Sequence, residues 1–403
     1  MSRDGSVAAE GRRGATTDGR VPMAIYCTYF GIDSHLRTTT ICALTPEDGE
    51  PGTRTFRGND YGEMAEWMAG FPQPSHGVYE SGCTGFVPAR MLTRGDTLVE
   101  PVASSKLPSS ADSRSRKNDR RDAERLARLA LAGEVSPVWV PPEQVEGLRE
   151  LAQAMDDLAC VREAARQRVN AILCRHGISW DERTPTGRLK KRWGQHFWNW
   201  LRSIDLGDAG SQAAYLAALS AAESAEVAYD ELRARAEGIA RASDLGPPVD
   251  ALMCVKGVGF SSALAFAAEV GDFSRFASGR KVTSYFGLAP SESSSAESRR
   301  LGRISRNGCA LVRKLLIEGA WVLARGNPAC RKRGGTSVPL AIREHARACS
   351  GRLLGRRREL VSRGLMPCKA NTATAAEMAR MLLYIGRDAQ EAAALAAEVA
   401  LVA

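Results

Sequence analysis

The 403-residue sequence contains only five histidines, and its ten cysteines are scattered without a single CxxC pair. Structural zinc sites need closely spaced cysteine and histidine ligands, so a zinc ribbon is not expected. The sequence also lacks a signal peptide and any apolar run long enough to span a membrane. These absences predict a cytoplasmic protein whose thiols are reduced.

The overall composition indicates a folded chain with an excess of positive charge. Apolar residues make up 44% of the sequence, which is too many for a disordered protein. A length of 403 residues predicts two or three domains rather than one core. The net charge of +9 favours a polyanionic partner such as nucleic acid.

The N-terminal third has the pattern of an α/β domain. Residues 1–22 are rich in Gly, Arg, Ser and Asp without periodicity, so they are predicted to be a disordered arm. Residues 23–138 predict three strands, then helix, strand, helix, strand and helix, the order of an RNase H-like α/β domain. The predicted strands are residues 24–32, 38–44, 53–56, 77–79 and 97–102, and the predicted helices are 61–68, 85–92 and 118–132.

The rest of the chain is predicted to be mainly helical. After a proline-rich boundary, residues 139–245 carry two heptad-like apolar seams, which predict an antiparallel helical hairpin or a partner-binding coiled coil. Residues 246–370 form the next predicted domain, in which a Gly-Val-Gly turn at 257–259 resembles a helix-hairpin-helix element and 271–304 is expected to be loop-rich. Residues 371–403 are predicted to be a C-terminal helix.

Four carboxylates occupy positions that an α/β sheet can bring together. Asp33 and Glu80 follow predicted strands, and Asp119 and Asp122 are three residues apart on one face of a predicted helix. Carboxylate oxygens are the ligands that Mg²⁺ prefers, and a pair of Mg²⁺ ions needs several of them. Local chemistry alone leaves open that these are ordinary surface acids.

The second half contains a serine run and a basic tail. Residues 291–298 read SESSSAES, which is either a flexible polar loop or the place of a nucleophilic serine beside Arg299, Arg300 and Arg303. Ten cations between Arg331 and Arg363 form either a solvated face or a phosphate-binding surface, and their density favours phosphate contact.

Several sequence blocks resemble those of the DEDD transposases of the insertion-sequence-110 family, which are similar to the Piv DNA invertases and carry a RuvC-like domain; for residues 23–138 the resemblance therefore implies a RuvC-like fold. In the first half these blocks are GIDSHLRTTTICAL, VYESGCTG and RKNDRRDAERLARL. In the second half, the stretch from LMCVKGVGFSSALAF through YFGLAPSESSS to RRLGRISRNGCALVRKLL is similar to that family's C-terminal transposase domain. The resemblance covers most of residues 24–325, with the blocks in the same order.

The resemblance implies a specific reaction. Members are recombinases of mobile elements, guided by a structured bridge RNA that pairs with target and donor DNA, and they act as tetramers built as dimers of dimers. It implies a nucleoid-associated bacterial protein in which Asp33, Glu80, Asp119 and Asp122 bind two Mg²⁺ ions. It also implies that Ser295, counted from the block at 287–290, forms a 5′-phosphoserine link to DNA. The residues expected to contact nucleic acid are Lys117, Arg120, Arg121, Lys256, Arg299, Arg300, Arg303 and Arg306.

The sequence departs from the family pattern around the nucleophile. Ala296 stands where a glycine usually follows the nucleophilic serine, and the adjacent Ser294 becomes the nucleophile if the alignment slips by one residue. Two other functions remain open beside the serine recombinase: a RuvC-like nuclease that uses metal-activated water, and a nucleic-acid-binding protein without catalysis. Conversion of Ser295 to alanine distinguishes the first two, since only a water-using nuclease would keep cleaving.

Overall fold

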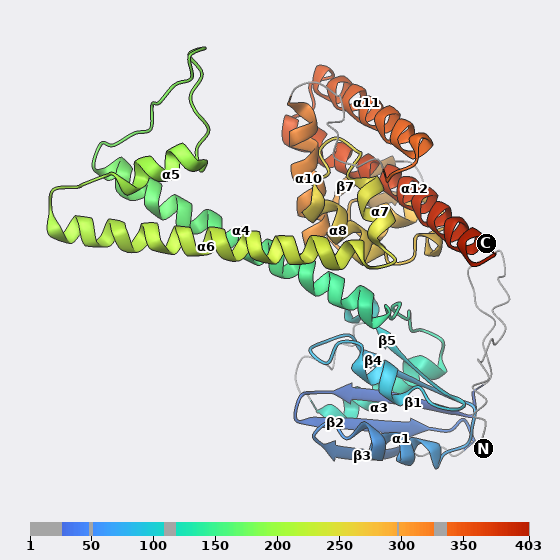
Figure 1. The fold of residues 1–403 in the computed structure, drawn as a ribbon. Coiled ribbons are helices and arrows are strands. Elements are labelled where there is room, and N and C mark those ends of the chain that lie inside the picture. The colour runs from blue at the N-terminus through green and yellow to red at the C-terminus, as the bar shows by residue number, and fades with distance from the viewer. Residues whose placement is uncertain (1–25, 48–50, 109–117, 296–297, 326–336, 403) are drawn as a thin grey trace. The chain divides into compact units, whose positions relative to one another are not determined.

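The structure is a computed structural model that describes residues 26–47, 51–108, 118–295, 298–325 and 337–402 (Figure 1). The chain divides into two units, Met1–Val140 and Pro141–Ala403. The division falls within the proline-rich segment, residues 137–142, that the sequence indicates as a boundary. The predicted arm, residues 1–22, lies outside the described residues, and the further division of the second unit into three parts stays a prediction.

The first unit is built on a mixed five-stranded sheet with the order β3-β2-β1-β4-β5. Strands β1, β2 and β3 pair antiparallel, whereas β4 pairs parallel with β1 and β5 pairs parallel with β4. This confirms the mixed α/β fold expected for the N-terminal region. The strands are β1 (Thr28–Ser34), β2 (Thr38–Leu44), β3 (Gly52–Arg57), β4 (Ser75–Glu80) and β5 (Thr97–Val102).

Helices cover both faces of this sheet. The apolar residues of α1 (Tyr61–Ala69) and α2 (Val87–Leu92) share a core with one set of strand residues, Phe30, Ile32, Ile41, Tyr79 and Val99. Helix α3 (Asp119–Leu131) packs on the opposite set, Tyr29, Val78, Val102, Cys42 and Leu44. Because side chains alternate between the faces of a strand, Asp33 and Glu80 belong to the α3 face.

The second unit begins with two long helices, α4 (Glu143–Arg175) and α6 (Ala209–Arg241). The beginning of α4 packs with the end of α6 in the helical core, through Leu148, Ala152 and Met155 against Ala236 and Ala240. The end of α4 packs with the beginning of α6 and with α5 (Gln195–Arg202) around an aromatic cluster. The two helices are therefore antiparallel, which agrees with the first of the two alternatives that the seams left open, and each end of the pair has its own apolar core (Figure 1).

A bundle of helices with one small hairpin forms the rest of this unit, which confirms the expected mainly helical character. The short helices are α7 (Gly246–Leu252), α8 (Phe260–Val270) and α9 (Gly279–Tyr285), and the longer ones are α10 (Ala310–Ala324), α11 (Leu340–Ser362) and α12 (Pro367–Val402). Strands β6 (Pro290–Ser295) and β7 (Ser298–Ile304) pair antiparallel. Among the residues for which the structure gives a conformation, no helix has both the length and the apolar character that crossing a bilayer requires.

The expectation that residues 271–304 are loop-rich is wrong for most of that segment. It contains α9, a short 3₁₀ turn at Phe273–Arg275, and both strands of the β6–β7 hairpin. The strands read PSESSS and SRRLGRI, so they lack the alternation of apolar and polar residues by which a strand is recognised. Their pairing comes from backbone hydrogen bonds, which the sequence pattern does not display.

Candidate active site

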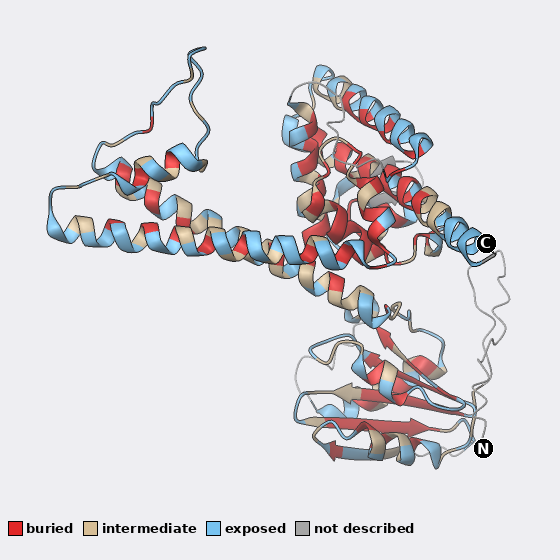
Figure 2. Ribbon diagram, viewed as in Figure 1, coloured by how far each residue is buried: buried red, intermediate tan, exposed pale blue. Residues whose placement is uncertain are grey.

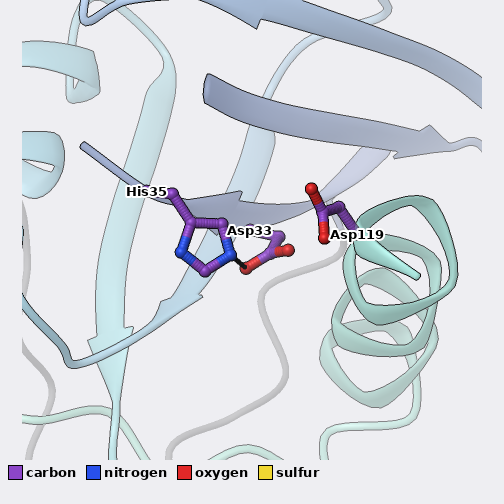
Figure 3. A group of neighbouring side chains, drawn as sticks. All are labelled: Asp33, His35 and Asp119. Carbon is purple, nitrogen blue, oxygen red and sulfur yellow. Dashed lines mark ion pairs between the residues drawn. The ribbon is translucent and has the colours of Figure 1, made fainter. Parts of the chain in front are cut away.

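Asp33, His35 and Asp119 form a cluster on the α3 face of the sheet (Figure 3). One potential ligand atom from each residue lies within 4.8 Å of the other two. The Nε2 atom of His35 is 3.2 Å from Oδ1 of Asp33, so the imidazole contacts one carboxylate oxygen. Asp33 lies within β1, His35 in the turn that follows, and Asp119 is the first residue of α3.

The close approach of α3 to β1 places Asp119 near Asp33. Gly31 lies two residues before Asp33, and a Cβ atom at this position would overlap the carbonyl oxygen of Ala123 and the amide nitrogen of Ala127. Only a residue without a side chain lets the helix backbone come so near to the strand. The first turn of α3 is fixed by Asn118, whose side-chain oxygen accepts a hydrogen bond of 3.0 Å from the Arg120 N–H.

The electrostatic surroundings of Asp33 suit a cation. Burial is the largest cause that raises the pKa of Asp33, and the nearby Asp119 and Asp122 raise it further, whereas His35 lowers it. The Oδ2 atom of Asp33 is buried and has no hydrogen-bond partner among the described residues. An unpartnered buried carboxylate oxygen is costly unless something satisfies it. A divalent cation would satisfy this oxygen and offset the repulsion from the two other aspartates, so the residues present fit a metal.

The other two predicted acids lie near this cluster but are not among its three ligand atoms. Glu80 is the last residue of β4 and is exposed, and the parallel register pairs its predecessor Tyr79 with Ile32, the predecessor of Asp33. Asp122 is half-buried on α3, one turn after Asp119. The structure therefore brings together two of the four acids and adds His35. In the sequence, His35 is marked only by its position two residues after Asp33. That position does not distinguish a residue of the site from a turn histidine without a function.

The candidate nucleophile lies in the second unit, on the β6–β7 hairpin. Ser295 is the last residue of β6 and pairs with Ser298. The register also pairs Ser294 with Arg299 and Ser293 with Arg300, so the backbone brings the serine run beside arginines that were predicted to contact DNA. Ala296, the departure from the family pattern, lies outside the described residues.

The remaining cations predicted to contact nucleic acid have different surroundings. Arg120 and Arg121 are exposed in the first turn of α3, next to the acid cluster, and Lys117 lies outside the described residues. Arg303 and Arg306 are exposed at and beyond the end of the β6–β7 hairpin. All four exposed arginines are thus accessible to a phosphate backbone.

The Gly-Val-Gly turn between α7 and α8 is packed into the protein. The N–H of Lys256 donates a hydrogen bond of 3.0 Å to Oγ of Ser350 on α11. Gly257 has a φ of 92°, and a Cβ there would overlap the carbonyl oxygen of Gly319 on α10. This turn therefore connects α7 to α8 and packs against α10 and α11, and the Lys256 N–H is already used within the fold.

Two segments match known family profiles. Residues 30–177 match the profile of the DEDD transposase domain of the IS110 family, described as a transposase, and residues 249–334 match the profile described as the Transposase IS116/IS110/IS902 family. The four acids fall within the first match and Ser295 falls within the second. Together with the acid cluster on a mixed sheet, these matches define a transposase, an enzyme that acts on DNA.

Proteins named as transposases are similar to this chain over more than half of its length. A putative transposase, y4qE, of Sinorhizobium fredii is 33% identical over 316 residues, covering 78% of this chain and 75% of that protein. The transposase for insertion sequence element IS1111A of Coxiella burnetii is 26% identical over 213 residues, covering 53% and 56%. The transposase for insertion sequence element IS1533 of Leptospira borgpetersenii is 25% identical over 258 residues, covering 63% and 72%. The chain belongs to the IS110 family of transposases, whose DEDD domain implies a RuvC-like fold and a divalent metal.

Proposed function

We propose that this transposase cuts and rejoins DNA through a covalent link between a serine and a 5′-phosphate. The observation that carries the metal-dependent part is the buried, unpartnered Oδ2 of Asp33 in a cluster with Asp119. The serine-dependent part is supported by the resemblance of the block around Ser295 to the family's nucleophile block. Ser295 lies in the second matched segment, on a hairpin that carries arginines.

In the proposed mechanism, Asp33 and Asp119 would hold one Mg²⁺ ion, and Glu80 and Asp122 would supply carboxylates for a second. When bound there, Mg²⁺ would withdraw negative charge from the reacting phosphate. His35 holds the Asp33 carboxylate through the contact of 3.2 Å. Arg120 and Arg121, exposed beside the acids, bind the phosphate backbone of the DNA that enters the site.

The chemical step is a transesterification. The hydroxyl oxygen of Ser295 forms a bond to phosphorus, the bond between phosphorus and the 3′ oxygen breaks, and the proton of the serine ends on that 3′ oxygen. The product is a 5′-phosphoserine and a free 3′ hydroxyl. Attack by the 3′ hydroxyl of another strand reverses the step and joins new ends without ATP, because the phosphodiester is replaced by an ester of similar energy.

The partners that we propose are target DNA, donor DNA, a structured bridge RNA and further copies of this chain in a dimer of dimers. The support is the family resemblance, together with the separation of the acids and the serine into two units of the chain. A mobility shift with RNA transcribed from the non-coding DNA next to the gene tests the RNA part. We expect tighter binding than to a scrambled RNA of equal length, and equal binding would contradict it.

The test of the proposed function is the covalent adduct. The full chain is incubated with Mg²⁺, guide RNA and end-labelled DNA, and the products are separated on a denaturing gel. We expect a protein–DNA adduct that Ser295→Ala abolishes and Ser294→Ala retains. An adduct that persists in Ser295→Ala but disappears in Ser294→Ala would identify Ser294 as the nucleophile.

A second candidate is a RuvC-like nuclease, which the acid cluster by itself also supports. In that enzyme a water molecule attacks the phosphate, so cleavage would continue in Ser295→Ala and no adduct would form in any variant. Cleavage that is lost in Asp33→Asn but kept in both serine variants would establish this alternative.

A further inference from the structure

Helix α11 carries an unusually dense set of arginines. Its 23 residues, Leu340–Ser362, include six arginines and two glutamates. The helix lies beyond residues 249–334, the second segment that matches a family profile. Figure 2 shows that one side of α11 is buried and the other exposed. The packing of the buried side does not account for the arginines on the exposed side.

Half of these arginines have partners within the protein. Arg352 pairs with Glu377 of α12 at 3.1 Å, and Arg356 pairs with Glu359 at 2.9 Å. Arg357 points inward, where its Nε donates a hydrogen bond of 2.6 Å to Oδ1 of Asn371. The other three are exposed and have no ion-pair partner among the residues whose positions are described: Arg343, Arg347 and Arg358.

These three arginines share one flank of the helix. At about 100° per residue, Arg343, Arg347 and Arg358 fall within a sector of about 60°, and at 1.5 Å per residue they span about 22 Å. Arg352 and Arg356 lie on the other flank of the exposed side, on the same helical geometry. Two arginine rows therefore border the outward-facing strip of α11.

The floor between the two rows is formed by Gly351, Gly355 and Ala348, and it also carries the exposed Glu344. Gly351 and Gly355 are exposed, and a Cβ atom at either position would have nothing within 4 Å. Glycine is disfavoured in the middle of a helix, and no packing contact among the described residues requires it here. The absence of side chains at these two positions lets a partner approach the helix backbone between the arginines.

We propose that the outer face of α11 binds the sugar-phosphate backbone of duplex DNA. A row of unpaired guanidinium groups about 22 Å long matches the regular negative charge of one DNA groove edge, and guanidinium binds phosphate in a bidentate manner. The glycine floor suits the close approach of a backbone rather than the reading of base edges. This surface would bind DNA without sequence preference, in addition to the contacts at the active site. The proposal rests on the proposed function, in which the protein acts on DNA.

The test is a binding measurement with the full chain. Fluorescence anisotropy of a labelled duplex of arbitrary sequence is followed in EDTA over a range of NaCl concentrations, so that neither the metal nor the serine contributes. The variant Arg343→Ala/Arg347→Ala/Arg358→Ala is compared with a control, Arg168→Ala/Arg175→Ala/Arg235→Ala, which removes three exposed arginines from the α4–α6 pair. A missing covalent adduct would overturn the proposed function and leave this measurement unaffected.

For the α11 variant we expect affinity at least about 10-fold weaker and a log–log salt slope smaller by about 2.7, since each lost phosphate contact changes the slope by about 0.9. A loss no larger than that of the control would overturn the proposal. The same titration with duplex RNA is the second arm. If the α11 variant loses RNA binding and keeps DNA binding, the surface binds RNA and the proposal is wrong.

A second variant keeps all charges and fills the floor. Gly351→Gln/Gly355→Gln introduces neutral side chains with higher helix propensity, so thermal stability should be equal or higher. We expect DNA affinity to fall several-fold because the backbone can no longer approach α11. Unchanged affinity in this variant would contradict the close approach on which the proposed surface depends.

Discussion

Gly31 of β1 lies directly against Ala123 of α3, so closely that a Cβ atom at position 31 would overlap the Ala123 carbonyl oxygen. This contact joins the strand that carries Asp33 to the helix that carries Asp119. Replacement of Gly31 by alanine must therefore push α3 away from the sheet or distort β1. Either change moves the two carboxylates apart.

For Gly31→Ala we expect a loss of about 1–3 kcal/mol in the free energy of unfolding, the usual cost of overpacking a core. Metal binding should be lost in the fraction that remains folded. Chemical denaturation and Mn²⁺ titration measure the two effects. The control is Gly52→Ala in β3, where a Cβ would make only ordinary contacts, the nearest at 3.5 Å to Phe71. Equal stability of the two variants would show that α3 does not need the glycine.

Much of the N-terminal sheet could be predicted from the sequence, because β1 and β2 are apolar and β-branched runs and the helices have clear periodicity. The approach of α3 to β1 could not, since it depends on which glycine faces which helix in three dimensions. The same holds for His35, whose contact with Asp33 depends on the direction of a turn side chain.

In the second unit, the helices could be predicted from the sequence but the strands could not. The antiparallel α4–α6 pair follows from two apolar seams, whereas the β6–β7 hairpin is formed by polar strands without a seam. Ser295 lies on that hairpin, so its local structure was the part of the site least visible in the sequence. The family blocks, rather than periodicity, single it out.

The raised pKa of Asp33 predicts how stability depends on pH in the absence of metal. Burial raises the pKa in the folded protein above the unfolded value of about 3.9, so ionisation of Asp33 disfavours folding. The stabilising contribution of the neutral acid is complete below the unfolded pKa and is lost as pH rises through the folded pKa. Asp33→Asn should therefore be at least as stable as the wild type at pH 7 in EDTA.

Added Mg²⁺ should reverse this order. At a concentration 100 times its dissociation constant, a cation that binds only the folded state stabilises it by about 2.7 kcal/mol, and Asp33→Asn should lose this gain. Thermal melts with EDTA and with Mg²⁺ at pH 5 and pH 7 check both parts. Glu66→Gln on α1, an exposed acid without an ion pair among the described residues, is the control for loss of one charge. A wild type that Mg²⁺ does not stabilise would argue against the site.

The contact between His35 and Asp33 predicts a positioning role for the imidazole. His35→Gln should weaken metal binding by about 10-fold, in the range found when a residue that supports a metal ligand is lost. The loss should be similar for Mg²⁺ and Co²⁺, because the imidazole acts through the carboxylate. A loss confined to Co²⁺ would instead indicate direct ligation, since imidazole favours transition metals. His196→Gln, in the exposed part of α5, controls for histidine removal.

The far end of the α4–α6 pair depends on a buried hydroxyl. Tyr215 donates a hydrogen bond of 2.7 Å to the carbonyl oxygen of Leu201, and burial raises the pKa of Tyr215 to about 12. Tyr215→Phe should lower the free energy of unfolding by about 1 kcal/mol, since it removes this hydrogen bond from the apolar core that α5 forms with the end of α4 and the beginning of α6. Tyr229→Phe is a suitable comparison. The guanidinium of Arg162 lies over the aromatic ring of Tyr229, 3.7 Å from the ring centroid, and phenylalanine keeps that ring. Equal effects of the two changes, measured by urea denaturation, would count against the Tyr215 bond.

The positions of Glu80 and Asp122 predict that the two metal ions depend on different acids. Asp33 and Asp119 belong to the compact cluster, so Asp119→Asn should weaken binding of the first metal. Glu80 is exposed at the end of β4, on the α3 face and outside that cluster, so Glu80→Gln should remove the second metal and keep the first. Isothermal titration with Mn²⁺ should then give two ions per chain for the wild type and one for Glu80→Gln. A stoichiometry of one in the wild type, unchanged by Glu80→Gln, would mean that a single ion supports the chemistry.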